Sequence, residues 1–515
     1  MESRNLSLSW PALIVTVALA SSLVNVSIGM SYGIPKPGVH DEFAYLLMGD
    51  TFAQGRLTNP THPMWPHFET YHVFHRPTYQ AKYPPAQGML LALAQIVAGL
   101  PILGVWVGLA AACAATCWML GAVVPRPWAF LGGMLLAVNP HAVGWWGQSY
   151  WGGAVAALGG ALFFGAVFRF QQRLLLRDSL LMALGVGLLV NSRPFEGLFA
   201  CLAAAPLIVL GTLRWRKSER SSQWIPRFAI PLGLGLLVVA AWALYYNHRL
   251  TGDAFTLPYL NWKPEASAIE SIRSYKGPAR LSIWTKLSRL EMFYVAPPIL
   301  WLSMFGLWAI VKQARTRFAL LVLLFVAVLG SRFTDVFPHY VAPFACLVSA
   351  VVVQGLRSLA GFRFRGRRMG MIVVTGVVIA SFAWDALYWK QLLEDGPLKG
   401  ALPSPRHWDA VFEAPAVMRE SMIETLEARP GKDLILVRYE ASRYVDRFEW
   451  VYNGSDIDAA EVVWARELSE PQNRRLRAYF KHRQVWLLDP EIVPLRLSPL
   501  SRTAISPERG EGSQK

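Results

Sequence analysis

Two adjacent carboxylates and one lysine are the residues of this sequence best suited to chemistry. Asp41 and Glu42 follow the first long apolar stretch, and Lys82 precedes Tyr83-Pro84-Pro85 where the next one begins. Charged side chains are costly in apolar surroundings, and those found there usually have a function. A carboxylate can act as general base toward a hydroxyl or amine, and an ammonium can pair with a lipid phosphate. The pattern favours a catalytic site at a membrane surface.

Each of these residues also has a purely structural explanation. Asp41 is well suited to cap a helix that begins near Phe43, because Asp is a common N-cap residue. Glu42 points elsewhere than Asp41 on a helix or strand, so one of the two can simply orient the other or hold a metal. Lys82 can extend its ammonium to water from a helix end. Only the combination of the acidic pair with the lysine raises the functional interpretation above the structural one.

An aromatic stretch from 139 to 153 holds three more candidates, His141, Gln148 and Tyr150. Aromatic faces with a few polar groups are typical of carbohydrate or prenyl-lipid pockets. An aromatic belt at the membrane interface explains the tryptophans of this stretch equally well.

Two charged groups complete the candidate set. Arg193 and Glu196 are three residues apart near the expected outer tip of a helical hairpin, and an internal ion pair is the favoured explanation for them. Arg332 and His339 lie in another outward-facing polar stretch, where they either bind phosphate or end helices.

The apolar stretches place the protein in a membrane. Runs such as 10–30, 228–246 and 371–384 are too long and too numerous for a soluble core. The formal net charge is +16, and residues 1–389 hold 31 basic against 14 acidic residues, whereas 390–515 hold 19 against 20. Basic residues in short loops between spans indicate cytoplasmic loops and contact with anionic membrane lipids. Nucleic acid is not expected as a partner.

The basic clusters predict the topology. Assigning the clusters near 169–177, 214–220, 312–317 and 357–368 to the cytoplasm leaves about eleven transmembrane helices. Spans are expected at about 228–247, 292–311, 318–331 and 339–356, whereas residues 88–168 allow several divisions into crossings. The expected fold class is an all-α polytopic membrane protein with a small C-terminal α/β soluble domain.

Three regions follow from this assignment. We expect a transmembrane domain over 1–389 with a large first outer loop at 33–87, a soluble α/β domain over 390–500, and a disordered tail over 501–515. In the soluble domain, 433–439 and 484–488 are typical of buried strands and 469–482 of a polar helix. The last span, near 370–388, leaves this domain on the outer side.

Several common chemistries have no signature here. The sequence has no Walker A loop, dinucleotide-binding glycine fingerprint, zinc-ligand spacing or nucleophile elbow. The four cysteines, at 113, 117, 201 and 346, lie in apolar segments, so no disulfide framework is expected. We predict no cofactor and no metal site, and a divalent metal stays an open alternative.

The order of these features resembles a known superfamily. A short N-terminal tail, one span, a large outer loop that opens with Asp41-Glu42-Phe43-Ala44-Tyr45, and Lys82-Tyr83-Pro84-Pro85 at the next span look like the GT-C membrane glycosyltransferases. The pattern is similar to the protein O-mannosyltransferases and the aminoarabinose transferases of lipid A. The resemblance covers roughly residues 1–390, chiefly as architecture. Relatives commonly show Lys-Pro-Pro, whereas Tyr83 intervenes here, and the second outer loop lacks the acidic residue that some relatives place there.

The resemblance implies a function. It suggests a transferase that moves a sugar from a polyprenyl-phosphate carrier to an acceptor of unknown class (lipid, glycan or protein) at the outer face, with inversion. Asp41 would be the base that activates the acceptor, with Glu42 beside it, and Lys82 would be a phosphate partner. The residues expected to bind substrate are His40, Lys82, Tyr83, His141, Gln148, Tyr150, Arg193, Glu196, Arg332 and His339.

Two other classes remain as alternatives. A polytopic transporter or lipid-linked glycan flippase would use the membrane charges to line a path, although transporters usually show internal repeats and none is visible here. A scaffold that binds a partner through its tail would make the first-loop charges dispensable. The short Arg-containing loops favour a bacterial inner membrane, with the C-terminal domain in the periplasm.

Overall fold

The computed structural model describes residues 9–263, 282–330, 332, 337–395, 410–439, 449–490 and 495–500. The chain divides into two compact units. Unit 1 comprises 1–35, 84–246 and 277–410, and unit 2 comprises 36–83, 247–276 and 411–515. Each unit therefore combines segments that are far apart in the sequence.

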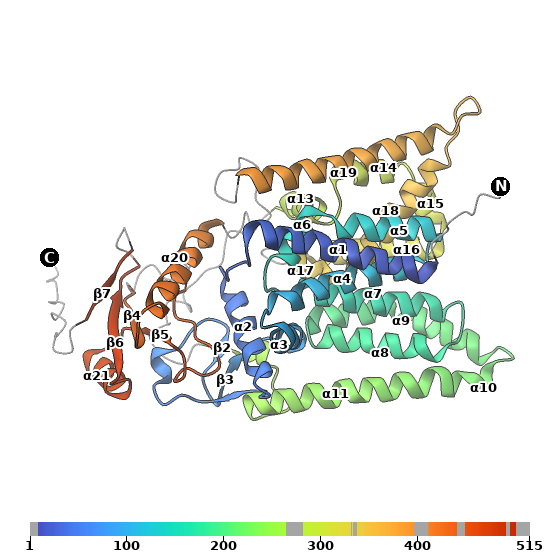
Figure 1. Cartoon of the computed structure of the whole chain (residues 1–515). Helices are drawn as coiled ribbons and strands as arrows, with labels where there is room; N and C mark the ends of the chain where they lie inside the picture. The colour runs from blue at the N-terminus through green and yellow to red at the C-terminus, as the bar shows by residue number, and fades with distance from the viewer. Residues whose placement is uncertain are drawn as a thin grey trace, which may run out of the picture. The chain divides into compact units, whose positions relative to one another are not determined.

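Unit 1 consists of helices, and Figure 1 shows most of them running side by side. Its elements are α1 (Trp10–Tyr32), α3 (Ala86–Ala98), α4 (Ile102–Leu120), α5 (Arg126–Ala137), α6 (Pro140–Gly147), α7 (Gly153–Phe170), α8 (Leu176–Val190), α9 (Pro194–Arg216), α10 (Ser221–Trp224), η2 (Ile225–Ala229), α11 (Ile230–Thr251), α13 (Ile283–Tyr294), α14 (Pro297–Met304), α15 (Leu307–Lys312), α16 (Ala314–Gly330), α17 (Pro338–Val341), η4 (Ala342–Phe344), α18 (Ala345–Ala360) and α19 (Met369–Asp395).

Seven helical segments among the described residues are long and apolar enough to cross a membrane. They are 10–32, 102–120, 153–170, 194–216, 221–251, 338–360 and 369–387. The most apolar windows of α7 and of the α17–α18 segment are 89% and 83% buried, whereas that of the α10–α11 segment is 11% buried. The first two therefore form the centre of the bundle and the third its periphery. The count of eleven crossings remains a prediction.

Small residues let the central helices approach closely. A Cβ atom added to Gly160 of α7 would lie 1.9 Å from the carbonyl oxygen of Pro343, and one added to Gly185 of α8 would lie 2.6 Å from the backbone nitrogen of Phe163. Small residues at helix interfaces are the usual way to pack membrane helices tightly. The glycines of α7 and α8 therefore help to place the core of unit 1.

Unit 2 contains two small sheets and several helices. Its elements are α2 (His40–Ala53), β1 (Asn59–Pro60), η1 (Trp65–His67), β2 (Val73–Phe74), β3 (Thr78–Ala81), α12 (Pro258–Asn261), α20 (Ala410–Glu427), β4 (Lys432–Val437), β5 (Val462–Arg466), α21 (Glu470–Tyr479), β6 (Arg483–Leu488) and β7 (Leu497–Pro499). The first sheet has the antiparallel order β1-β3-β2. The second has the order β5-β4-β6-β7, in which β5 and β6 run parallel to β4, and β7 runs antiparallel to β6.

The elements expected from the sequence are partly confirmed. Strands β4 and β6 and helix α21 lie where the soluble domain was expected to have them, whereas β5 and β7 were not foreseen. The stretch 292–311, expected as a single span, is not one continuous helix, because it is divided among α13, α14 and α15. Two prolines follow α13, and Gly306 interrupts the helix where its backbone meets Gly355 of α18. Residues 501–515 lie outside the described part of the chain.

Candidate functional site

Helix α2 carries the acidic pair in its first turn. Val39 is the N-cap residue, and Oε2 of Glu42 accepts hydrogen bonds from the backbone N–H groups of Gly38 and Val39, at 2.7 and 3.2 Å. The side chain of Glu42 is buried. It satisfies backbone donors at the start of the helix, which would otherwise cost free energy when buried. The alternative that Asp41 caps this helix is therefore wrong, and the geometry gives Glu42 a structural role.

Asp41 is oriented by Tyr83 and remains partly open to solvent. The hydroxyl of Tyr83 donates a hydrogen bond to Oδ1 of Asp41, while the Asp41 side chain is 38% exposed. Burial, reinforced by the carboxylate of Asp41, raises the pKa of Tyr83, so this tyrosine stays protonated and remains a donor. Its ring stacks on that of Tyr45 at a centroid distance of 4.6 Å. Asp41 is thus oriented but accessible, as a general base must be.

Lys82 lies among three aromatic rings. Its Nζ is 5.6 Å from the ring centroid of Tyr83, 5.2 Å from that of Tyr259 and 5.0 Å from that of Trp262. Aromatic faces attract a cation without neutralising it. Burial lowers the pKa of Lys82 to about 8, although Asp41 acts in the opposite direction. Within the described ranges no carboxylate forms an ion pair with this ammonium, which leaves it suited to bind an anion.

His72 joins the two charged residues. Its Nε2 is 3.9 Å from Oδ2 of Asp41, and its carbonyl oxygen accepts a hydrogen bond from the backbone N–H of Lys82 at 2.9 Å. Its ring lies 5.6 Å from those of both Tyr83 and Trp262. Burial, and next the charge of Lys82, lower the pKa of His72 to about 3, so the imidazole is neutral at physiological pH.

The backbone of His72 is in an uncommon conformation. Its φ is +64°, in the left-handed region, and its buried Nδ1 has no hydrogen-bond partner within the described residues. Such a conformation costs about 1–3 kcal/mol and is found mainly at functional sites. Sequence reasoning missed His72, Tyr259 and Trp262. His72 lies in the loop that the sequence analysis singled out, but no sequence signal brings residues 259 and 262 to Lys82.

His40 borders the same cluster. Its ring stacks on Tyr71 at 4.4 Å, and its Nδ1 lies 3.2 Å from the hydroxyl oxygen of Tyr452. Burial lowers the pKa of His40, with the charges of Glu449 and Asp41 acting against that shift. The structure therefore brings together five of the predicted site residues in unit 2, which are His40, Asp41, Glu42, Lys82 and Tyr83.

The other predicted residues belong to unit 1. The guanidinium of Arg193 lies 3.9 Å from the Glu196 carboxylate and 5.3 Å from the ring of Tyr340, so the ion pair expected as the structural explanation is present. Arg332 is exposed after the end of α16, and His339 packs edge-on against Trp151 at 5.2 Å.

The aromatic stretch is organised mainly by hydrogen bonds to other parts of unit 1. Gln148 donates to the side-chain oxygen of Asn25 at 3.1 Å, and Tyr150 donates to the carbonyl of Pro35 at 3.1 Å. His141 lies in α6 and is partly buried. The substrate-binding roles of these residues remain predictions.

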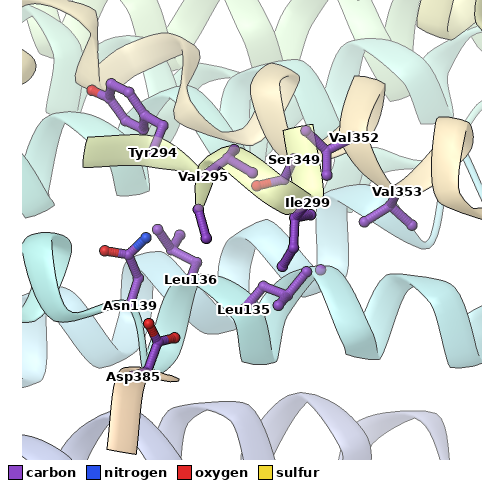
Figure 2. A pocket seen from close by; sticks show the side chains of 12 residues that line it. Leu135, Leu136, Asn139, Tyr294, Val295, Ile299, Ser349, Val352, Val353 and Asp385 are labelled. Atoms are coloured by element: carbon purple, nitrogen blue, oxygen red, sulfur yellow. The ribbon is translucent and has the colours of Figure 1, made fainter. Parts of the chain in front are cut away.

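A pocket of unit 1 contains none of the predicted site residues. Figure 2 shows the side chains of Asn139 and Asp385 at one end of it, with Tyr294 above, and Ser349 and aliphatic side chains along the rest. The empty space in and just outside this pocket has a volume of about 430 Å³.

Among the described residues no group of three or more His, Cys, Asp or Glu side chains is arranged to hold a metal ion.

Comparisons with known proteins identify the fold. No family model matches the sequence, and no curated protein matches it. The chain is similar to ArnT from Cupriavidus metallidurans in the apo state, with a TM-score of 0.51 and 14% identity over 94% of this chain and 93% of that one. ArnT bound to undecaprenyl phosphate gives a TM-score of 0.48 and 13% identity, with the same coverage. The arabinofuranosyltransferase AftD from Mycobacteria gives a TM-score of 0.52 and 16% identity over 94% of this chain and 35% of AftD.

The likenesses with TM-scores of 0.51 and 0.52 show the fold. The chain is a polytopic membrane protein with the GT-C fold and a small C-terminal sheet. The resemblance read from the first outer loop is therefore confirmed at the level of the fold. A fold by itself leaves the activity to be argued from the site.

Proposed function

We propose that the protein is a glycosyltransferase that moves a sugar from a polyprenyl-phosphate carrier to an acceptor at the outer face of the membrane. The observation that carries this proposal is the clustering of Asp41 and Lys82, which both lie against Tyr83 and His72. An accessible carboxylate and a cation that pairs with no carboxylate of the described residues form a base and an anion site within one cluster. The GT-C fold supports the assignment, and the carrier class follows the first-loop resemblance.

The reaction is a direct displacement. Oδ2 of Asp41, the oxygen not held by Tyr83, takes the proton from the hydroxyl or amine of the acceptor. The acceptor atom attacks the anomeric carbon, and the bond from that carbon to the phosphate oxygen breaks with its electron pair going to the leaving polyprenyl phosphate. The Lys82 ammonium stabilises that negative charge. Attack opposite the leaving group inverts the configuration of the sugar.

Contacts within unit 2 support placing the tail on the same side of the membrane as the first outer loop, and the charge pattern of the loops supports the outer side for both. The tail, here residues 411–500, touches the first outer loop at several points, for example through the 2.7 Å ion pair of Lys36 with Glu420. Two segments in contact must lie on the same face of the membrane. We therefore place the C-terminal domain with the first loop on the outer face, and a bacterial inner membrane remains our prediction for the location.

Release of the carrier lipid tests the proposal. Purified protein is incubated with radiolabelled polyprenyl-phosphate sugars and candidate acceptors, and free carrier is measured. We expect Asp41→Asn to stay folded and to lose transfer by several orders of magnitude. Asp253→Asn, which removes an exposed carboxylate of the same unit, is the matched control and should retain activity.

Two results would contradict the proposal. Comparable transfer by the Asp41→Asn and wild-type proteins would remove Asp41 as the base. Movement of labelled lipid between leaflets without any release of carrier would favour the transporter or flippase alternative.

A further inference from the structure

One short segment of the tail lies against the part of the first outer loop that carries Asp41. Residues 449–458, between β4 and β5, lie against the first outer loop inside unit 2. The hydroxyl of Tyr79 donates to the carbonyl of Asn453 at 3.0 Å, and Oδ2 of Asp50 accepts from the backbone N–H of Ser455 at 2.8 Å. These bonds fix the segment on α2 and β3, which belong to the loop that carries Asp41.

Tyr452 is the residue of this segment that lies beside the site. Its ring stacks on that of Phe43 with a centroid distance of 4.4 Å and an interplanar angle of 2°. Its hydroxyl lies 3.2 Å from Nδ1 of His40 and 3.3 Å from the carbonyl oxygen of Tyr71. His40 and Phe43 flank Asp41 and Glu42 in the first turn of α2. Tyr452 therefore contacts both sides of the acidic pair.

A buried arginine holds Tyr452 in place. Arg419 of α20 donates to the carbonyl oxygens of Trp450 and Tyr452, at 3.3 and 2.8 Å. Its guanidinium lies 5.1 Å from the ring of Phe43 and 4.6 Å from that of Trp464. The same side chain thus ties the 450–452 backbone to the aromatic residue on which Tyr452 stacks. The position of the Tyr452 hydroxyl is set by the folded tail.

The hydrogen bonds of this hydroxyl indicate which ring nitrogen of His40 carries the proton. The carbonyl of Tyr71 can only accept, so the Tyr452 hydroxyl gives its single proton to that carbonyl. Both bonds can form at once only if the hydroxyl oxygen accepts from Nδ1–H of His40, which is the tautomer we infer. A neutral imidazole carries one proton, so Nε2 of His40 is an acceptor. The ring is further held between this bond and the stack on Tyr71.

We propose that Tyr452 is a positioning residue of the active site, through which the tail fixes the orientation and tautomer of His40 beside Asp41. Nε2 of His40 can then accept a hydrogen bond from the substrate that receives the sugar, next to the base Asp41. The kinetic consequence rests on the proposed glycosyltransferase function, whereas the hydrogen-bond assignment does not. The tail is accordingly part of the catalytic apparatus, although it contributes no group to the chemical step.

Tyr452→Phe is the discriminating variant, because it keeps the ring on Phe43 and removes only the hydroxyl. We expect a fall in kcat of roughly tenfold, in line with the loss of about one hydrogen bond. The KM for the polyprenyl-phosphate sugar should stay within about twofold, since Lys82 is untouched, and the melting temperature should change by only a few degrees. Tyr479→Phe is the matched control, because it removes an exposed hydroxyl that donates to Asp458 in the same tail, and it should behave as wild type.

Nitrogen-15 NMR of labelled histidine tests the contact without any activity. The signals of His40 are identified by their loss in His40→Gln. We expect the wild type to carry the proton on Nδ1, and Tyr452→Phe to lose that preference. A proton on Nε2 in the wild type, or an unchanged His40 in Tyr452→Phe, would overturn the proposal whatever the kinetics.

The two hypotheses fail in different ways. If wild-type protein transfers no sugar from any donor, the proposed function fails and the NMR result still decides the contact. If wild type is active and Tyr452→Phe has an unchanged kcat, or if Tyr479→Phe loses as much, the positioning role is rejected while the glycosyltransferase function stands.

Discussion

At Asp41 the two carboxylate oxygens have different neighbours. Oδ1 accepts the Tyr83 hydroxyl, and Oδ2 faces the neutral imidazole of His72 at 3.9 Å. Tyr83 is the residue that interrupts the Lys-Pro-Pro pattern common in relatives, and here it orients the carboxylate. The intervening tyrosine therefore has a structural task, which is its hydrogen bond to Asp41. Tyr83 was expected to bind substrate, and the geometry favours a role in placing the base.

The ionisation of Lys82 predicts how transfer depends on pH. Burial lowers its pKa to about 8, below the usual value of a lysine. The ammonium, which binds phosphate, is the protonated form, so it is present below pH 8 and is lost as the pH rises through that value. We expect kcat/KM to fall above about pH 8 in a profile measured from pH 6 to 9.5.

Lys82→Arg provides the control for this assignment. A guanidinium stays charged throughout this range, so the variant should be less active at pH 7 but should show no decline between pH 8 and 9.5. A decline of equal size in both proteins would assign the alkaline limb to another group.

Helix α2 shows how two neighbouring carboxylates acquire different tasks. Glu42 turns back onto the N–H groups of Gly38 and Val39, whereas Asp41 leaves the first turn toward Tyr83 and His72. An amide oxygen can still accept hydrogen bonds, so we expect Glu42→Gln to retain most of the transfer activity. Glu42→Ala leaves buried donors without a partner and should destabilise the protein by about 1–3 kcal/mol.

Thermal unfolding and transfer assays on the two Glu42 variants and on Asp41→Asn separate these roles. A loss of transfer in Glu42→Gln as large as that in Asp41→Asn, with unchanged melting temperature, would instead indicate that Glu42 has a catalytic role beside Asp41.

The elements that build the site differ in how far the sequence could predict them. Asp41 and Lys82 were found because charged residues beside apolar runs are costly, and Tyr83 was found because it lies in the Lys-Tyr-Pro-Pro motif that carries the resemblance. His72, Tyr259, Trp262 and Tyr452 come to the same cluster from separate segments, and each is an ordinary aromatic or imidazole residue in its own stretch. Periodicity reports local structure, so it contains no information on these long-range contacts.

In unit 1, hydropathy predicted the positions of long regular helices but did not predict where helices are interrupted. Helices α11, α16, α18 and α19 follow the predicted spans closely. The stretch from 292 to 311 was assigned to one span because its residues are apolar throughout. A close backbone approach to Gly355 at Gly306 breaks it instead, and such an approach is a property of the packed bundle.

At the scale of the whole molecule, the contacts of the tail with the first loop make a prediction about topology. Both segments must lie on one face, whereas we expect the basic turn between α18 and α19 on the cytoplasmic side because of its charge. The native cysteines lie in α4, α9 and α18, so single introduced cysteines can report the two faces. Arg474 of α21 has a side chain that is 68% exposed, and Arg365 lies in the exposed basic turn.

We expect Arg474→Cys to react with a membrane-impermeant maleimide in intact cells, and Arg365→Cys to react only after permeabilisation. Labelling is read as a mass shift of the purified protein, with the parent protein as the background control. If Arg474→Cys is protected until the membrane is opened, the tail lies inside, and its contacts with the loop would bring Asp41 and Lys82 to the cytoplasmic face as well. The donor would then have to be presented from that side, and the proposed outer-face transfer would be excluded.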